Sequence, residues 1–181
     1  MAGTLDWTPA LDRPELTAPP VAAALAALPA ADAASVRVAA IDPGLADTAE
    51  FCAAYGVGLD VSANCVVLAV KREGARHLAV CVVLATTRAD VNGRARRALD
   101  ARKASFAPMD VAVAESGMEQ GGITPVGLPP GWPLLVDAAV AATAEVVVGS
   151  GLRRSKLLLP GPLVAALPGA AVLDDLAVPV G

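Results

Sequence analysis

Aromatic side chains are scarce in this chain of 181 residues, since Phe, Tyr and Trp together make up 3% of the sequence. Hydrophobic residues nevertheless make up 55%, so closely packed Ala, Val and Leu must fill the core in place of large rings. Such a core favours a sheet covered by Ala-rich helices. Because the length is about that of one ordinary domain, we expect a single α/β domain.

Long apolar runs and metal-binding patterns are also missing. The longest apolar run, residues 78–85, is much shorter than the ~20 residues of a membrane-spanning helix. The sequence begins with no basic region followed by an apolar stretch, so we expect no secretory signal, no membrane partner and a cytoplasmic location. The three cysteines fit no metal-ligand spacing and His77 is the only histidine. These counts predict reduced core thiols, no metal and no cofactor.

Proline and glycine divide the chain into short elements. Four prolines fall within residues 1–20, which favours an extended N-terminal arm ahead of one domain over residues 21–181. Apolar periodicity and breaker residues predict helices over residues 21–28, 46–55, 94–103, 108–115 and 163–167. The same signals predict strands over residues 36–41, 64–70, 77–84, 133–136, 145–148 and 156–159, with a last strand over 171–173.

The strands over residues 64–70 and 77–84 are separated by a short, charged segment that contains Gly74, which is typical of a hairpin. Strands outnumber the helices that could cross over between them. We therefore expect an α/β (α+β) fold whose mixed sheet contains antiparallel pairs, rather than a doubly wound parallel sheet.

Charge is distributed unevenly along the chain. Residues 1–60 hold eight carboxylates against two arginines, whereas residues 61–181 hold ten carboxylates against twelve Lys and Arg. Two stretches of the second part are rich in basic residues: Arg94, Arg96, Arg97, Arg102 and Lys103, and then Arg153, Arg154 and Lys156. They predict one phosphate-binding rim if the fold brings them together, and two solvated faces if it does not.

Glycine and proline are concentrated in residues 117–130, where four glycines and three prolines occupy fourteen positions. This composition excludes a regular helix or strand. A loop of this kind can direct successive backbone N–H groups into one concavity and bind an oxyanion, or it can be a plain structural turn. It lacks the Gly-Lys-Ser/Thr ending of a nucleotide-binding loop and the spacing of a dinucleotide fingerprint.

The order of the motifs from this loop onward carries a family resemblance. The run Gly121-Gly122-Ile123-Thr124-Pro125 is followed by an apolar strand ending in Asp137, a Val-rich strand, a Gly-x-Gly pair and Lys156-Leu-Leu-Leu. This order resembles the YbaK and ProX family of aminoacyl-tRNA-editing domains over residues 46–177. The resemblance implies a mixed, strongly curved sheet flanked by helices. It also implies hydrolysis of the ester in a tRNA mischarged with a small amino acid.

The resemblance and the charge pattern together give a set of candidate site residues. The catalytic loop would be Gly121, Gly122, Ile123, Thr124 and Pro125, whose N–H groups face the ester while water, assisted by the tRNA ribose hydroxyl, attacks. Substrate contacts would come from Asn64, Gly117, Met118, Asp137, Gly151, Ser155 and Lys156. Contacts to tRNA phosphates would come from Arg94, Arg97, Arg102, Lys103, Arg153 and Arg154. The implied partners are the 3′ acceptor end of an aminoacyl-tRNA and an aminoacyl-tRNA synthetase.

Asn64 departs from the family pattern, because most members carry a lysine at this position. We hypothesise that Asn64 lines the pocket and that the basic helix or Lys156 supplies the missing charge; Asn64 could instead be a strand-end residue. Asp137 could likewise cap the next helix. Two other functions stay open: a non-catalytic relative that binds an aminoacyl or nucleotide-like ligand or a protein, and an interaction domain that uses the acidic N-terminal arm.

Overall fold

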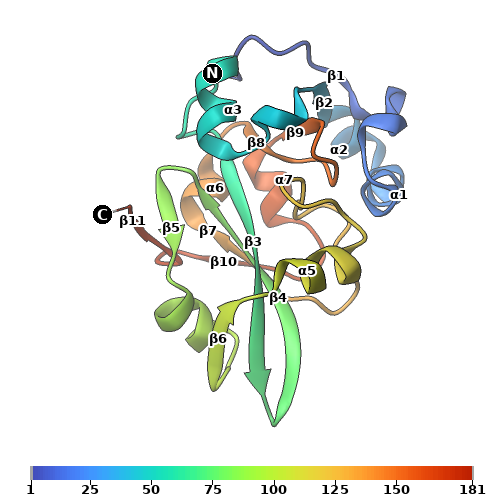
Figure 1. Ribbon diagram of the computed structural model, residues 1–181. Coiled ribbons are helices and arrows are strands. Elements are labelled where there is room, and N and C mark those ends of the chain that lie inside the picture. Colours follow the sequence, from blue (N-terminus) through green and yellow to red (C-terminus); the bar gives the residue numbers. More distant parts are fainter. Residues whose placement is uncertain (1, 181) are drawn as a thin grey trace.

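The computed structural model describes residues 2–180, which form short helices around three sheets (Figure 1). The α-helices are α1 (Pro19–Ala27), α2 (Ala30–Ser35), α3 (Thr48–Tyr55), α4 (Arg96–Ala98), α5 (Met109–Ser116), α6 (Ala138–Ala142) and α7 (Gly161–Ala165). Shorter or wider turns of helix are η1 (Ala10–Asp12), η2 (Pro14–Leu16), η3 (Pro43–Leu45) and η4 (Val91–Ala95). Within residues 2–180, no helix is long and apolar enough to cross a membrane.

The largest sheet is built on a long hairpin. Its five strands lie in the order β10 (Ala170–Leu173), β7 (Leu134–Asp137), β4 (Ala75–Leu84), β3 (Ala63–Arg72) and β6 (Lys103–Phe106). β3 and β4 pair antiparallel over their whole length, from Ala63 opposite Leu84 to Arg72 opposite Ala75. Glu73 and Gly74 make the turn with positive φ angles, as a tight hairpin requires. The predicted hairpin is confirmed.

A second sheet lies beside the N-terminal half of β3. Its order is β1 (Thr8–Pro9), β2 (Arg37–Ala40), β9 (Ser155–Leu159) and β8 (Val146–Gly149), all antiparallel. A single parallel bridge between Ser62 and Val147 joins it to the larger sheet. A third, two-stranded sheet pairs β5 (Thr87–Ala89) with β11 (Ala177–Pro179). The mixed α/β fold is confirmed, but its strands are divided among three sheets instead of one continuous curved sheet.

The core is assembled from small aliphatic side chains, as the composition predicts. Alternate residues of β3 and β4 face two separate clusters: Val67 and Val82 belong to one, and Leu68 and Val83 to the other. A third cluster lies between α3 and the β8–β9 pair and contains Phe51, which is 1% exposed. These layers fix where each side chain of β3 points, and β3 forms one wall of the candidate site.

The first twenty residues differ from the extended arm predicted above. Thr8 and Pro9 pair with β2, and Ala10, Leu16 and Ala18 are buried in the largest core cluster. The prolines start two short helical turns and α1 instead of keeping the segment extended. Apolar residues between the prolines therefore tie residues 2–20 to the body of the protein.

The basic helix predicted to reach Lys103 is also shorter than expected. The helical segment ends at Ala98, and Asp100, with a φ of 50°, turns the chain away. Lys103–Phe106 then pairs with β3 as β6, because the outer edge of β3 offers unpaired backbone groups there. A further strand, β11, follows the strand predicted to be the last.

Candidate active site

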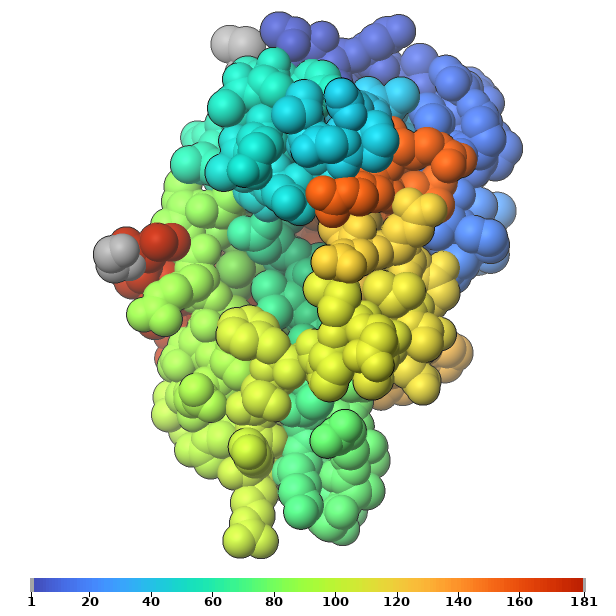
Figure 2. All heavy atoms as spheres, in the orientation of Figure 1, coloured from blue at the N-terminus to red at the C-terminus, as the bar shows by residue number. Residues whose placement is uncertain are grey.

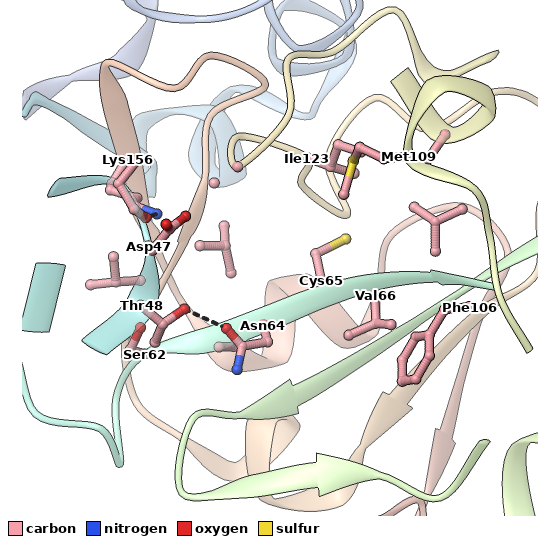
Figure 3. A pocket seen from close by; sticks show the side chains of 18 of the residues that line it. Asp47, Thr48, Ser62, Asn64, Cys65, Val66, Phe106, Met109, Ile123 and Lys156 are labelled. Carbon is pink, nitrogen blue, oxygen red and sulfur yellow. Dashed lines mark hydrogen bonds between the residues drawn. The ribbon is translucent and has the colours of Figure 1, made fainter. Parts of the chain in front are cut away.

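A cavity of about 460 Å³ opens between the N-terminal half of β3, the start of α3, the glycine-rich loop and the ends of β8 and β9 (Figure 3). One end is polar and the other apolar. The polar end is lined by Asp47, Thr48, Ser62, Asn64 and Lys156. The apolar end is lined by Cys65, Val66, Phe106, Met109 and Ile123, among others. Gly121 and Gly149 also contribute to the wall.

The cavity lies at a gap in the pairing of β3. β6 covers the outer edge of β3 only from Leu68 onward, and the N–H of Ala107 donates to the carbonyl of Val67 just before it. At the N-terminal end of the gap, along the same edge, β8 pairs with this chain segment at Ser62, through a bridge with Val147. Backbone groups of successive residues alternate between the two edges of a strand, so the N–H and C=O of Cys65 point into the gap. The strand therefore presents backbone donors and acceptors to the cavity.

The glycine-rich loop is held in place by a backbone clamp. Gly117 adopts the left-handed conformation that ends α5 and releases the chain into the loop. The N–H of Glu119 donates to the Gly151 carbonyl and the N–H of Gly151 to the Gly122 carbonyl, both at 2.8 Å. The Glu119 carboxylate accepts from the Arg153 N–H at 2.7 Å. These bonds keep the loop rigid against the turn between β8 and β9.

Two residues of the loop combine a place in the cavity wall with a backbone N–H that no protein group of the described chain accepts. The N–H of Gly122 is used in a turn, where it donates to the Glu119 carbonyl at 3.0 Å. Within residues 2–180, the N–H groups of Gly121 and Ile123 have no protein acceptor, and both residues line the cavity. Rigid donors beside a cavity can stabilise negative charge that develops on a bound carbonyl oxygen. This arrangement favours the oxyanion-binding interpretation over the plain turn.

Lys156 supplies a buried cation at the polar end. Its side chain is 8% exposed, and its ammonium donates to the Ala46 carbonyl at 2.9 Å and lies 5.0 Å from the centre of the Phe51 ring. Burial lowers the pKa of Lys156, although the nearby Cys52 and Asp47 act in the opposite direction. In the described part of the chain no carboxylate lies within 4.0 Å of this ammonium. The hydrogen-bond acceptor of this ammonium in the described part of the chain is the Ala46 carbonyl.

Two side-chain contacts close the polar end around α3. Asp47 precedes α3, and its carboxylate lies 3.4 Å from the guanidinium of Arg153, which also donates to the Pro43 carbonyl at 2.9 Å. Thr48 begins α3, and its hydroxyl donates to the Asn64 side-chain oxygen at 2.6 Å. Asn64 lies on the face of β3 opposite to Cys65, on the side of Val83. The Asn64 side chain is therefore directed away from the Cys65 face and held by Thr48, although the residue contributes to the wall of the cavity.

The apolar end carries two exposed hydrophobic side chains, and at the polar end the Asp47 carboxylate is also exposed. Phe106 is 68% exposed and Met109 is 47% exposed, whereas Val147 at the polar end is 1% exposed. Burial raises the pKa of the Cys65 thiol, with a smaller contribution from Cys81. Burial also raises the pKa of Cys81 to about 12. Cys65 is therefore a neutral, apolar wall residue rather than a nucleophile.

Four of the predicted site residues meet in this cavity: Asn64, Gly121, Ile123 and Lys156. The other predicted substrate contacts do not line it. Asp137 caps α6 by accepting from the Ala139 N–H at 3.0 Å, and its second oxygen accepts from the Ala177 N–H. The Ser155 hydroxyl donates to the Leu16 carbonyl at 2.6 Å. Gly117 ends a helix, Met118 is in the core and Gly151 belongs to the backbone clamp.

The two basic stretches do not form a common rim. Arg94 pairs with Asp175, and the segment that carries Arg94 and Arg97 lies beside β5, far from β9 in Figure 1. Arg153 is used at the polar end of the cavity, and the Arg154 guanidinium donates to the Glu15 carbonyl at 2.8 Å. Arg102 and Lys103 are exposed at the start of β6. Local sequence clustering was therefore a poor guide to spatial clustering.

Five of the lining residues carry weak sequence signals, and we did not predict them: Asp47, Thr48, Ser62, Phe106 and Met109. An Asp-Thr pair at a helix start resembles an ordinary cap, and Phe106 and Met109 resemble ordinary apolar residues. Among residues 2–180, no group of three or more His, Cys, Asp or Glu side chains could hold a metal ion.

The family model of the aminoacyl-tRNA editing domain matches residues 42–166. The chain belongs to this family. The matched region contains both walls of the cavity, from Asp47 and Asn64 to the glycine-rich loop and Lys156. Membership supports a role in tRNA editing. No curated protein matches the chain.

Solved structures share the fold of this family member at low identity. A protein proposed to be a trans-editing enzyme for prolyl-tRNA synthetase has a TM-score of 0.71 and 21% identity, with 90% of this chain and 98% of that chain covered. A scaffold protein from a study of computational epitope grafting has a TM-score of 0.72 and 21% identity over 90% and 99% of the two chains. A hypothetical protein has a TM-score of 0.68 and 22% identity over 78% and 91%.

Proposed function

We propose that this editing domain hydrolyses the ester that joins a small, wrong amino acid to the 3′ end of a tRNA. The observation that carries the proposal is the pair of acceptor-free N–H groups of Gly121 and Ile123 on the cavity wall, within the described residues 2–180. The family membership supports the reaction class, since its members are aminoacyl-tRNA editing domains. The ligand is the acceptor end of a free aminoacyl-tRNA, and an aminoacyl-tRNA synthetase is the partner that would charge it.

The reaction needs a water molecule and a site for negative charge. Water adds to the ester carbonyl, the carbonyl oxygen becomes an oxyanion, and collapse of this intermediate releases the amino acid and the ribose hydroxyl. Fixed N–H donors stabilise the oxyanion without reorganisation, and one such donor changes the rate by about 10²–10³-fold in well-studied hydrolases. Lys156 adds a positive charge at the buried end of the same cavity. No side-chain nucleophile is required, and Cys65 is a neutral thiol.

The two ends of the cavity suit the two parts of the substrate. Phe106 and Met109 are exposed at the mouth, where an aromatic ring and a thioether can contact the terminal adenine. The buried end, enclosed by α3 and the second sheet, then receives the amino acid. Because this end is enclosed, discrimination among amino acids would come from the exclusion of larger side chains.

A deacylation time course with tRNAs charged with Ala, Ser, Cys, Thr or Pro tests this proposal. The loop variant is Gly121→Ala and its matched control is Gly131→Ala. Both glycines have a similar positive φ, 79° and 85°, so both substitutions carry the same backbone cost. The added methyl group would meet the Arg153 guanidinium at position 121 but open space at position 131. We expect hydrolysis of at least one ester by the wild type, with loss of activity only in Gly121→Ala.

The alternative of a non-catalytic domain is favoured by Asn64, which stands where most family members carry a lysine. Its test is the variant Asn64→Lys in the same assay. If Asn64→Lys hydrolyses the ester and the wild type does not, the natural protein is a binding domain. That result would overturn the deacylase proposal. Equal or lower turnover by Asn64→Lys supports the interpretation that Lys156 already supplies the charge.

A further inference from the structure

A second hollow lies at the far end of β3, away from the candidate active site. It has a volume of about 390 Å³ and is lined by Ala69, Val70, Lys71, Gly74, Arg76, Lys103 and Ser105. Figure 2 shows the tip of the β3–β4 hairpin in green and the segment leading into β6 in yellow-green, projecting side by side with a cleft between them. We call this hollow the basic groove. Its charged lining residues are all cations.

The cations of the basic groove face one another across the sheet. Lys71 on β3 lies directly opposite Arg76 on β4 and also directly opposite Lys103 on β6. Directly opposed residues of antiparallel strands point to the same face of the sheet, and like charges in such pairs are destabilising. The three cations therefore share one face of the sheet, and each pair of directly opposed side chains carries like charges. This arrangement costs stability unless an anion occupies the groove.

The protein itself supplies little neutralisation. Within residues 2–180, no carboxylate lies within 4.0 Å of the charged nitrogens of Lys71, Arg76 or Lys103. The carboxylate of Glu73 at the hairpin turn lies 4.0 Å from the side chain of Arg72, a neighbour of the groove. All three groove cations are exposed. The groove is thus a site of uncompensated positive charge open to solvent.

The basic groove is aligned with the candidate active site. Lys71 lies on the same face of β3 as Val67 and Cys65, because the three positions differ by even steps. Lys71 lies six positions after Cys65 along β3, a distance of roughly 20 Å. A polynucleotide strand carries one phosphate per nucleotide, so several phosphates can span this distance. One polynucleotide strand can therefore reach from the cavity to the groove.

We propose that the basic groove binds the phosphate backbone of the tRNA acceptor strand whose 3′ end enters the cavity. This inference rests on the proposed function, since it assumes that the cavity receives an aminoacyl end. It assigns phosphate contact to Lys71, Arg76 and Lys103, of which only Lys103 belongs to the basic stretches that are evident in the sequence. Arg102 lies beside Lys103 and adds to the same patch.

The test is the binding of labelled, uncharged tRNA as a function of salt, measured by fluorescence anisotropy on the full chain. The groove variant is Lys71→Gln/Lys103→Gln, and the matched control is Arg13→Gln/Arg88→Gln, which removes the same charge elsewhere. We expect the groove variant to bind on the order of tenfold more weakly near physiological salt. Its salt slope should fall by about one for each phosphate that is no longer neutralised. The control should bind like the wild type.

Two further measurements separate the failure of this inference from the failure of the deacylase proposal. Hydrolysis of a short substrate, the aminoacyl ester of adenosine, should be unchanged in the groove variant, because the ester of one nucleoside cannot reach the groove. The thermal midpoint of the groove variant should be equal to or above that of the wild type, since opposed like charges are removed. If the wild type hydrolyses neither aminoacyl-tRNA nor the adenosine ester, the deacylase proposal is wrong. The anisotropy measurement would still show whether the basic groove binds tRNA.

Unchanged affinity and salt slope in the groove variant would overturn the inference. An equal loss of affinity in the control variant would overturn it as well, because the effect would then reflect net charge alone. Weaker binding that is specific to the groove variant, together with normal hydrolysis of the adenosine ester, would establish the basic groove as a tRNA contact surface.

Discussion

The two ends of the cavity differ in how their side chains are held. At the polar end, Lys156 is almost fully buried against a carbonyl and an aromatic ring, and Thr48 holds the amide of Asn64. At the apolar end, Phe106 and Met109 are exposed hydrophobic side chains. The polar end carries a cost in folding stability, because it keeps a cation out of water. The apolar end leaves hydrophobic surface uncovered, which is a cost in solubility.

This difference between the two ends indicates which end takes part in catalysis and which in substrate recognition. A charge kept in a low-dielectric environment acts strongly on a reacting group, so the polar end suits chemistry. Exposed side chains suit recognition of a ligand that arrives from solvent. We therefore expect variants at the polar end to change the rate of hydrolysis, and variants at the apolar end to change the affinity for substrate.

The largest effect is expected from Lys156→Met, which keeps an unbranched side chain but removes the charge. We predict that the rate constant for deacylation falls by roughly 10²-fold. The free energy of unfolding should stay within about 1 kcal/mol of the wild type, because a buried charge and its desolvation cost disappear together. Single-turnover kinetics and urea denaturation measure the two quantities. A large loss of stability with normal kinetics would assign Lys156 to the core.

Alkaline pH should affect the same end of the cavity. Because burial lowers the pKa of Lys156, the unfolded chain binds more protons than the folded chain between this lowered pKa and the ordinary value of 10.5. In that window the stability of the wild type relative to Lys156→Met must rise with pH, while deacylation must fall as the ammonium is lost. Urea denaturation and rate measurements across this range check both directions. Parallel pH profiles of the two proteins would contradict the assigned role.

A smaller effect is expected at the apolar end from Phe106→Ala. We predict that KM for aminoacyl-tRNA rises about tenfold with little change in kcat, because base stacking on an aromatic ring is worth about 1–3 kcal/mol. Stability should not change, since Phe106 is already 68% exposed. Val172→Ala serves as the control, because Val172 is another exposed apolar residue, 45% exposed, on β10. A lower kcat with an unchanged KM would contradict the assignment of substrate binding to the apolar end and of chemistry to the polar end.

The smallest effect is expected within the glycine-rich loop itself, from Thr124→Val. Thr124 is fully buried, and its hydroxyl has no hydrogen-bond partner within residues 2–180. Replacing an unsatisfied buried hydroxyl with a methyl group of similar shape should raise the free energy of unfolding by about 1 kcal/mol. Deacylation should be unchanged, because Thr124 does not line the cavity. A clear loss of activity would mean that its hydroxyl reaches the substrate or a bound water molecule.

The two walls of the cavity also differ in how far the sequence predicts them. The glycine-rich loop and the β3–β4 hairpin were identified from sequence, because glycine and proline act on the backbone locally. The proximity of Asp47, Asn64 and Lys156 could not be predicted from spacing, since three separate elements bring them together. Asp137 was assigned to the site by resemblance and proved to be a helix cap. Phe106 was missed because β6 depends on the open edge of β3, which no local pattern reveals.

The most direct test of the central claim is an amide NMR titration with a non-hydrolysable analogue, adenosine that carries alanine through a 3′-amide. We predict that the N–H signals of Gly121 and Ile123 shift and saturate with the ligand, while that of Gly131 stays unchanged. Such a result would place the ligand against these two N–H groups, as the proposed reaction requires. Saturable binding that leaves the signals of Gly121 and Ile123 in place would contradict it.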